Sequence, residues 1–322
     1  MSAQPYFSVL ITAYNRAGQL TRCIRSVSEQ TFGDFEIVVV DDASTDATAE
    51  VLAAIQEPRM RVITHPVNRG ISPARATTVQ EAQGAWLVML DSDWELVPES
   101  LQRLRALIDG LPEGVRMIRS CLRWDDGTVS PSVLPAGVTD YPGRLKWLEA
   151  QWLDGGSSDA AHCIHRDVFV RTNYPSDRRG VIEMKWETDI ARDEPSLWVP
   201  DVLGLQHTDA ANSATRETKA SRLMPRLISE APDLRWMAET MLADHGRELA
   251  RYAPNYRRWL LESALLESLL CGDRRAGLRH FRQTRRAGVS GPQPWATLAL
   301  GLIGPGALAR AKLYGRQLRS WR

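Results

Sequence analysis

The first hundred residues alternate between short uninterrupted apolar runs and apolar residues at helical spacing. The runs are typical of strands buried on both faces, and they cover residues 7–13, 35–40, 60–64 and 85–90. Helices are expected between and after them. The first has Leu20, Cys23, Ile24 and Val27 on one face, and the others cover residues 44–55, 72–83 and 98–109. Strand–helix alternation at this spacing predicts a mostly parallel sheet with helices on both faces.

The pattern changes twice further along the chain. Residues 111–214 are less regular, although Val115–Trp124 alternates like a strand and the Asp125-Asp126-Gly127 run predicts a hairpin turn. From about Thr215, leucines and methionines return at helical spacing. We therefore expect two domains, an α/β domain at 1–214 and an α-helical C-terminal region at 215–322.

The sign of the net charge changes at the same position in the chain. Over 322 residues the net charge is +1, and the apolar and charged fractions of 43% and 25% are those of an ordinary globular protein. Residues 1–214 carry a balance of −10 and residues 215–322 a balance of +11. The small net charge argues against a protein that is basic all over, so we expect no nucleic-acid partner.

The basic C-terminal region has its arginines concentrated in one expected helix: Arg274, Arg275, Arg279, Arg282, Arg285 and Arg286. They predict contact with an anionic membrane surface or an anionic acceptor, or else a solvated arginine-rich face packed on the acidic part. Four scattered cysteines without a CxxC pair indicate a reducing compartment. The start of the chain has no leader-like pattern, so we expect a cytoplasmic protein, with peripheral attachment at the inner face of the membrane as one alternative.

Polar residues cluster where three of the expected strands end. In an open α/β sheet, ligands bind beyond the carboxyl ends of the strands. The clusters are Thr12, Tyr14 and Asn15, then Asp41 and Asp42, then Asp91, Ser92 and Asp93. The turn after the first strand holds a single glycine, Gly18, which argues against a dinucleotide-binding turn and against a phosphate-cradling loop.

Five motifs in order give the chain a specific resemblance. They are SVLITAYNR from residue 8, SEQTF from 28, VDDASTD from 40, NRG from 68 followed by Ala74-Arg75, and LDSD from 90. Over residues 7–210 the chain resembles the family-2 inverting glycosyltransferases with the GT-A fold. That resemblance implies a nucleotide-diphospho-sugar transferase fold, a mostly parallel sheet flanked by helices.

The resemblance also implies the contacts to the donor. Thr12, Tyr14 and Asp42 match the positions that hold the nucleobase and ribose, and a carboxylate suits a pyrimidine N–H. Arg75 matches a basic contact near the phosphates, with an exposed helix arginine as the alternative. Asp41 is better explained as a cap that stabilises a helix N-terminus.

Asp91-Ser92-Asp93 resembles the family's DxD motif. Carboxylate oxygens suit Mn²⁺ or Mg²⁺, and such an ion stabilises the charge on a departing nucleoside diphosphate. Asp93 is the expected direct ligand, while Asp91 helps through ribose or water. His207 matches a histidine that completes the metal shell in relatives, and a structural or exposed histidine is the alternative.

The general base is expected on the acceptor side, at the start of a helix. The family's acidic pattern matches Trp186-Glu187-Thr188-Asp189-Ile190 with Trp186 in place of the usual leading Glu. Glu187 falls on the base position, and Asp189 and Glu183 are its rivals. Residues 155–159 and 165–166 resemble the segment that lines the donor sugar and the acceptor. Trp147, Trp152, Trp186 and Trp198 are candidates to stack on a sugar.

The resulting prediction is a metal-dependent inverting glycosyltransferase of the hexosyltransferase type. It would move a sugar from a nucleoside-diphosphate sugar to an acceptor hydroxyl on a polysaccharide, glycolipid, other glycoconjugate or natural product. Two alternatives stay open: a catalytically inactive sugar-nucleotide-binding or scaffold protein, and a nucleotidyltransferase on a similar fold.

Overall fold

The structure is a computed structural model, and it describes residues 4–135, 137–155, 159–172, 174–180, 183–207 and 220–319. The chain forms two compact units, Met1–Ala211 and Asn212–Arg322. The boundary expected at residue 214 lies outside the described residues. Each unit is considered by itself below.

The first unit is built on a ten-stranded sheet. Its strands are β1 (Phe7–Ala13), β2 (Phe35–Asp41), β3 (Met60–Thr64), β4 (Trp86–Asp91), β5 (Trp94–Leu96), β6 (Met117–Trp124), β7 (Val129–Ser130), β8 (Gly137–Thr139), β9 (Ala161–His165) and β10 (Ser196–Gln206). They lie in the order β3-β2-β1-β4-β9-β6-β10-β5, with β7 beside β6 and β8 beside β10. The four strands predicted from the N-terminal apolar runs are parallel neighbours, whereas β9 inserts antiparallel between β4 and β6.

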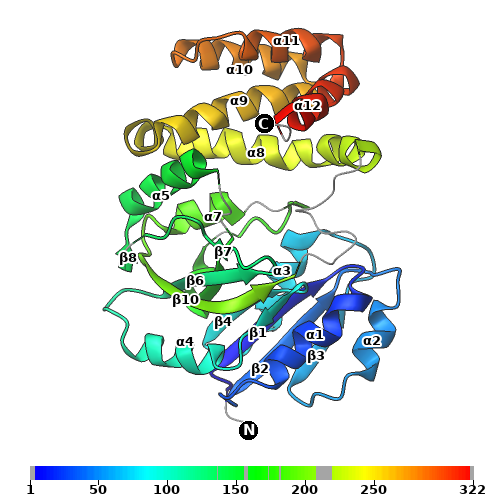
Figure 1. Ribbon diagram of the computed structural model, residues 1–322, viewed down its shortest axis with the longest axis vertical. Coiled ribbons are helices and arrows are strands. Elements are labelled where there is room, and N and C mark those ends of the chain that lie inside the picture. Colours follow the sequence, from blue (N-terminus) through cyan, green and yellow to red (C-terminus); the bar gives the residue numbers. More distant parts are fainter. Residues whose placement is uncertain are drawn as a thin grey trace. The chain divides into compact units, whose positions relative to one another are not determined.

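Helices cover both faces of this sheet (Figure 1). They are α1 (Ala17–Ser28), α2 (Thr48–Ala54), α3 (Ile71–Glu81), α4 (Ser100–Asp109), α5 (Tyr141–Asp154), α6 (Arg166–Arg171) and α7 (Glu183–Ile190). Because successive strand residues point to opposite faces, Val9 and Ile11 pack with α1, α2 and α4. Leu10 between them packs with α3, α6 and α7 on the other face.

Helix α2 begins later than the sequence pattern predicts. Asp41 Oδ1 accepts a hydrogen bond from the Ser44 amide at 3.0 Å, and Asp46 Oδ1 accepts one from the Thr48 amide at 3.0 Å. These short-range bonds hold the backbone after β2 in turns, with Ala43 at a φ of 60°, and compete with helix formation. The helix therefore starts at Thr48, and Asp41 caps a turn.

The second unit is helical, as the sequence predicts. Its helices are α8 (Ala220–Tyr252), α9 (Pro254–Leu270), α10 (Arg274–Arg286), α11 (Gln293–Ile303) and α12 (Pro305–Arg319). Leu269 of α9 is fully buried in their core. A Cβ at Gly277 or Gly301 would lie 2.5 or 2.6 Å from its side chain, so α10 and α11 approach α9 closely only because of these glycines. Among the described helices, none is both long and apolar enough to span a bilayer.

Candidate active site

Strand register brings the three polar clusters to one edge of the sheet. Thr12 near the end of β1 lies opposite Asp91 at the end of β4, and Ala13 lies opposite Asp41. The loops that follow are joined, because Asn15 Oδ1 accepts a hydrogen bond from the Thr45 amide at 2.8 Å. The expectation that these strand ends share an edge is therefore met.

A cavity of about 270 Å³ opens beside the end of β4. It is lined by residues from β4, β9 and the helices α3, α5 and α7, together with Trp94 and the segment before β9: Arg75, Met89, Asp91, Trp94, Trp147, Asp159, Ala160, His162, Glu183, Met184 and Glu187. Five of its lining residues are acidic or basic at neutral pH: Arg75, Asp91, Asp159, Glu183 and Glu187. A cavity that combines charged side chains with apolar and aromatic ones is suited to a polar, charged ligand such as one that carries both anionic and ring groups.

Arg75 joins two of the carboxylates of this cavity. It is buried, its Nη2 donates to Asp91 Oδ1 at 2.6 Å, and its Nη1 pairs with Glu183. The alternative of an exposed helix arginine is therefore wrong. Arg75 presents a buried guanidinium in the wall of the cavity, where it could also meet an anionic ligand.

Asp93 is half-buried and lies near the negative charge of Asp91. Burial, and then the nearby charge of Asp91, raise its pKa to about 6, and the positive charge of Arg16 offsets this only in part. Excess negative charge of this kind fits a divalent cation. Among the described residues, no group of three or more His, Cys, Asp and Glu side chains could hold an ion alone. Magnesium-type sites commonly use one or two carboxylates together with substrate phosphates, so Asp91 and Asp93 fit that chemistry.

His207 follows β10 and lies beside the same loop. Its amide donates to the Asp93 carbonyl at 3.0 Å. Its ring, however, contacts other carboxylates: Nδ1 lies 2.7 Å from Asp125 and Nε2 lies 2.5 Å from Glu95. Both ring nitrogens are therefore engaged, and a metal ion at His207 would have to displace one of these partners.

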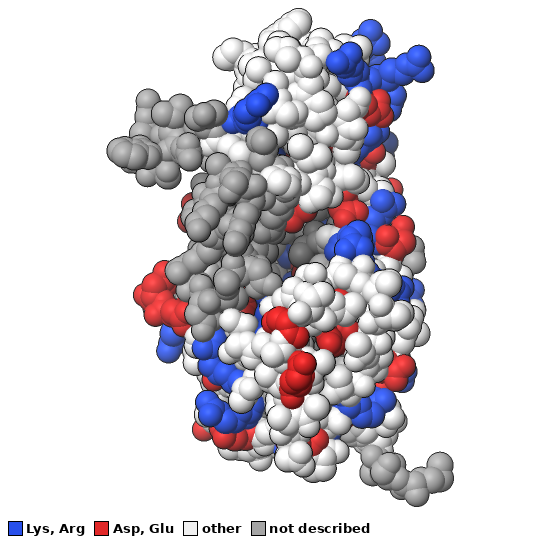
Figure 2. All heavy atoms as spheres, turned by 90° about the vertical axis from the view of Figure 1, so that its right-hand side faces the viewer, with Lys and Arg blue, Asp and Glu red and all other residues white. Residues whose placement is uncertain are grey.

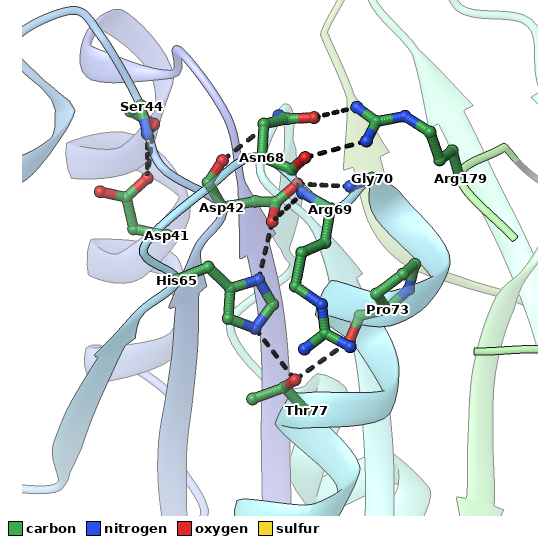
Figure 3. A network of polar contacts seen from close by, with 10 residues as sticks. All are labelled: Asp41, Asp42, Ser44, His65, Asn68, Arg69, Gly70, Pro73, Thr77 and Arg179. Atoms are coloured by element: carbon green, nitrogen blue, oxygen red, sulfur yellow. Dashed lines mark hydrogen bonds and ion pairs between the residues drawn. The ribbon is translucent and has the colours of Figure 1, made fainter. Parts of the chain in front are cut away.

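Asp42 is the centre of a buried network (Figure 3). Its carboxylate accepts from the amide of Arg69 at 2.9 Å and of Gly70 at 2.7 Å, and it lies 2.7 Å from His65 Nδ1. His65 Nε2 in turn contacts Thr77 Oγ1 of α3 at 3.0 Å. Asp42 therefore fixes the loop that leads into α3, while Thr12 is half-buried and Tyr14 is exposed at the same edge.

Glu187 is surrounded by two arginines and a histidine. Its Oε2 is 2.9 Å from Arg119 Nη1 and 2.7 Å from Arg144 Nη2, and its Oε1 is 3.3 Å from His162 Nδ1. All four side chains are largely buried. Burial alone would raise the pKa of Glu187, but Arg119, His162 and Arg144 lower it to about 2. Glu187 is thus an ionised carboxylate that also holds two arginines in place.

The two rivals of Glu187 differ in position. Glu183 lines the cavity, whereas Asp189 does not. Both oxygens of Asp189 accept from Lys185 Nζ, at 2.5 and 2.6 Å, within helix α7. The cavity therefore brings together Glu187 and Glu183 and leaves Asp189 outside.

His162, Arg119 and Arg144 are site residues that the sequence patterns missed. The only sequence signal was a charged Arg119 inside an apolar strand. The segment at His165 was expected to line the donor sugar, but His165 pairs with Trp86 at the opposite end of β4. Because β9 runs antiparallel to β4, its His162 end, and not its His165 end, lies at the candidate site.

The tryptophans divide between the core and the site. Trp186 and Trp198 are each 2% exposed and pack with other aromatic rings, so they belong to the core. Trp152 is 43% exposed. Of the four, only Trp147 lines the cavity, where Trp94 joins it.

Sequence comparison finds a known family similar to most of this unit. Residues 8–166 match the family described as glycosyl transferase family 2. The succinoglycan biosynthesis protein ExoO of Rhizobium meliloti is 41% identical over 100 residues, 31% of this chain and 29% of that protein. A PGL/p-HBAD biosynthesis glycosyltransferase of Mycobacterium bovis is 39% identical over 110 residues, 33% of this chain and 43% of that protein. The matched segment thus spans less than half of either relative.

Structural comparison extends the likeness over most of the chain. Staphylococcus aureus TarS 1-349 in complex with UDP-GlcNAc has a TM-score of 0.56 at 16% identity, over 88% of this chain and 91% of that one. The mannosyltransferase PcManGT of Pyrobaculum calidifontis, in complex with GDP-Man and Mn²⁺, has a TM-score of 0.54 at 18% identity, over 97% and 88%. The fold is the GT-A fold followed by a helical region, and residues 8–166 are similar to glycosyl transferase family 2.

Proposed function

We propose that this protein is an inverting glycosyltransferase that moves a hexosyl unit from a nucleoside-diphosphate sugar to an acceptor hydroxyl. The observation that carries the proposal is the charged cavity at the carboxyl edge of the sheet, where Asp91, Arg75 and Glu187 meet. The family and two structural neighbours, which bind UDP-GlcNAc and GDP-Man, support a sugar-nucleotide donor. The names of the relatives favour an acceptor in polysaccharide or glycolipid biosynthesis.

In this proposal, residues at the ends of different strands bind different parts of the donor. Thr12 and Tyr14 contact the base and ribose directly, and Asp42 shapes the same subsite through the loop that its carboxylate holds. Asp91 and Ser92 follow at the ribose and diphosphate, with the Arg75 guanidinium facing the phosphates. Asp93 and Asp91 would hold a Mn²⁺ or Mg²⁺ ion, with His207 at its margin.

When bound, such an ion supplies positive charge that stabilises the departing nucleoside diphosphate. The chain itself orients the donor through Arg75 and provides a carboxylate for the acceptor proton. Glu187 takes that role in our proposal because it lines the cavity, matches the family's base position and is ionised. Proton removal by a placed carboxylate contributes about 10²–10⁴-fold to the rate.

Calorimetry of nucleoside-diphosphate binding tests the metal part of this proposal. With Mn²⁺ present, Asp93→Asn should weaken UDP or GDP binding by at least about tenfold, because one charged ligand is lost. In EDTA, mutant and wild type should bind alike. The Asp34→Asn variant, at an exposed position, serves as control. Equal affinities of the Asp93 mutant and the wild type in Mn²⁺ would refute the assignment.

Donor turnover tests the reaction itself. A panel of UDP- and GDP-sugars is incubated with the full chain and Mn²⁺, and release of the nucleoside diphosphate is followed. We expect release from at least one donor and its loss in EDTA. Binding of a donor without turnover in the presence of candidate acceptors would favour the inactive sugar-nucleotide-binding alternative.

A further inference from the structure

A second cavity lies wholly within the helical unit. Helices α8, α9 and α10, with Ala287 after α10, line an open cavity of about 530 Å³. Part of its lining is apolar, with Leu242, Ala243, Leu261 and Ala287. A volume of this size is typical of pockets for small organic molecules.

One wall of this cavity is a closed polar network. Glu239 accepts from Arg235 Nε at 2.9 Å and contacts His280 Nε2 at 2.7 Å. Burial would raise the pKa of Glu239, but these hydrogen bonds lower it. The Gln283 amide oxygen lies 2.9 Å from the other ring nitrogen of His280. The negative charge of this wall is therefore already matched by its own partners.

The arginine charges that line this cavity, in contrast, have no carboxylate partner among the described residues. Arg257 and Arg286 both line the cavity, and within the described residues neither guanidinium has a carboxylate partner. The Nε of Arg257 is buried and finds no hydrogen-bond acceptor in the described part of the chain. The adjacent Arg258, by contrast, pairs with Glu262 at 3.2 Å outside the cavity. A buried donor without an acceptor costs about 1–3 kcal/mol, which an anionic ligand would relieve.

We propose that this cavity binds a small organic anion, with its phosphate or carboxylate group against Arg257 and Arg286. The remainder of the ligand would pack on Leu242 and Leu261. Guanidinium groups recognise phosphate and carboxylate through two parallel N–H bonds, so both anions share the chemistry that this site offers. The site is separate from the candidate active site and does not depend on the proposed transfer reaction.

Titration calorimetry of the full chain tests the proposal. The probes are glucose 6-phosphate for a phosphate ester, glucuronate for a carboxylate, and glucose as the uncharged counterpart, all in EDTA. We expect saturable binding of at least one of the two anions, weaker at high salt, and no binding of glucose. The anion that binds with the higher affinity identifies the class of ligand, a phosphate ester or a carboxylate.

Matched variants locate the binding. Arg257→Gln should weaken the anion's affinity by at least about tenfold, whereas Arg258→Gln should change it less than about twofold. Ala243→Phe places a ring in the cavity from an exposed position and should also weaken binding while the chain stays folded. UDP binding in Mn²⁺ should be the same in all three. No saturable binding by either anion, or equal losses in the Arg257 and Arg258 variants, would overturn the proposal.

Discussion

At the scale of the residue, Glu187 has two roles, as the proposed general base and as a buried ion-pair partner, and the two favour different pKa values. A general base works best with a pKa near the working pH, yet Arg119, His162 and Arg144 hold the pKa of Glu187 at about 2. The same contacts mean that the ionised form of Glu187 stabilises the folded state. A buried carboxylate paired with two arginines leaves both uncompensated if it is neutralised. The two roles have separate consequences that can be measured.

The structural role predicts an acid-dependent stability. The pKa of Glu187 is lowered in the folded state, so its ionised form contributes stability above about pH 4.5, and this is lost as the pH falls towards 2. Glu187→Gln should therefore cost about 3 kcal/mol of unfolding free energy at pH 7. The difference from wild type should shrink steadily below pH 4.5. Urea unfolding at several pH values measures it, and a difference that does not change with pH would contradict this account.

The catalytic role predicts a selective loss of transfer. Glu187→Gln should lower transfer by about two to four orders of magnitude while nucleoside-diphosphate affinity in Mn²⁺ stays near wild type. Asp189→Asn, outside the cavity, should cost far less. If a folded Glu187→Gln protein transfers normally and Glu183→Gln does not, the base is Glu183. Normal transfer by all three variants would place the base elsewhere.

At the scale of the element, the entry to α3 depends on a close backbone approach. Gly70 has a φ of 99° and donates to Asp42, and the next amide, of Ile71, donates to the Arg179 carbonyl at 3.1 Å. A Cβ at Gly70 would lie 2.5 Å from that same carbonyl oxygen. Only glycine allows the strained φ and the contact together. The helix that carries Arg75 is thereby fixed at its first turn.

Gly70→Ala should therefore destabilise the protein by about 1–3 kcal/mol and weaken nucleoside-diphosphate binding. Thermal unfolding and calorimetry measure the two effects. Gly33→Ala is the matched control, because a Cβ there meets nothing within 4 Å and the change should be nearly neutral. If Gly70→Ala is as stable as the control, the close approach at Arg179 does not constrain this loop.

At the scale of the whole molecule, the chain joins an acidic unit to a basic one. Helix α10 buries Ala276, His280 and Phe281 and exposes six arginines, of which only Arg286 also lines the cavity of the helical unit. On the side drawn in Figure 2, basic side chains gather on the helical unit, whereas acidic and basic ones are interspersed over the sheet unit. Such a face is suited to an anionic surface.

Vesicle co-sedimentation tests the membrane prediction. Replacing Arg275, Arg279 and Arg282 together with Gln should weaken binding to phosphatidylglycerol vesicles by about a hundredfold, at about 1 kcal/mol per charge. None of the three lines the cavity of the helical unit, so glucose 6-phosphate binding should not change.

The first control for this prediction removes the same number of positive charges from the other unit. The same triple exchange at Arg103, Arg116 and Arg123 of the first unit should leave sedimentation nearly unchanged. High salt should release the wild-type protein, and phosphatidylcholine vesicles should not bind it. If the wild-type protein does not bind anionic vesicles at low salt, the membrane prediction is wrong and the arginines form a solvated face.

The amino-acid sequence determined the order of strands and helices over the first hundred residues and the position of the polar clusters. Continuous β-branched runs and helical spacing are local signals, and parallel strands then place Thr12, Asp42 and Asp91 at one edge. It also determined the similarity of residues 8–166 to a known family and the helical nature of the second unit. Each of these follows from neighbours in sequence.

Tertiary structure alone decided which side chains meet. The antiparallel insertion of β9 brings His162 to the site and takes His165 away, and no local pattern distinguishes the two directions. The packing of β6, α5 and α7 surrounds Glu187 with Arg119 and Arg144, and the same long-range contacts give His207 its partners. Charge state depends on these distances and on burial, which the spacing of residues along a chain does not contain.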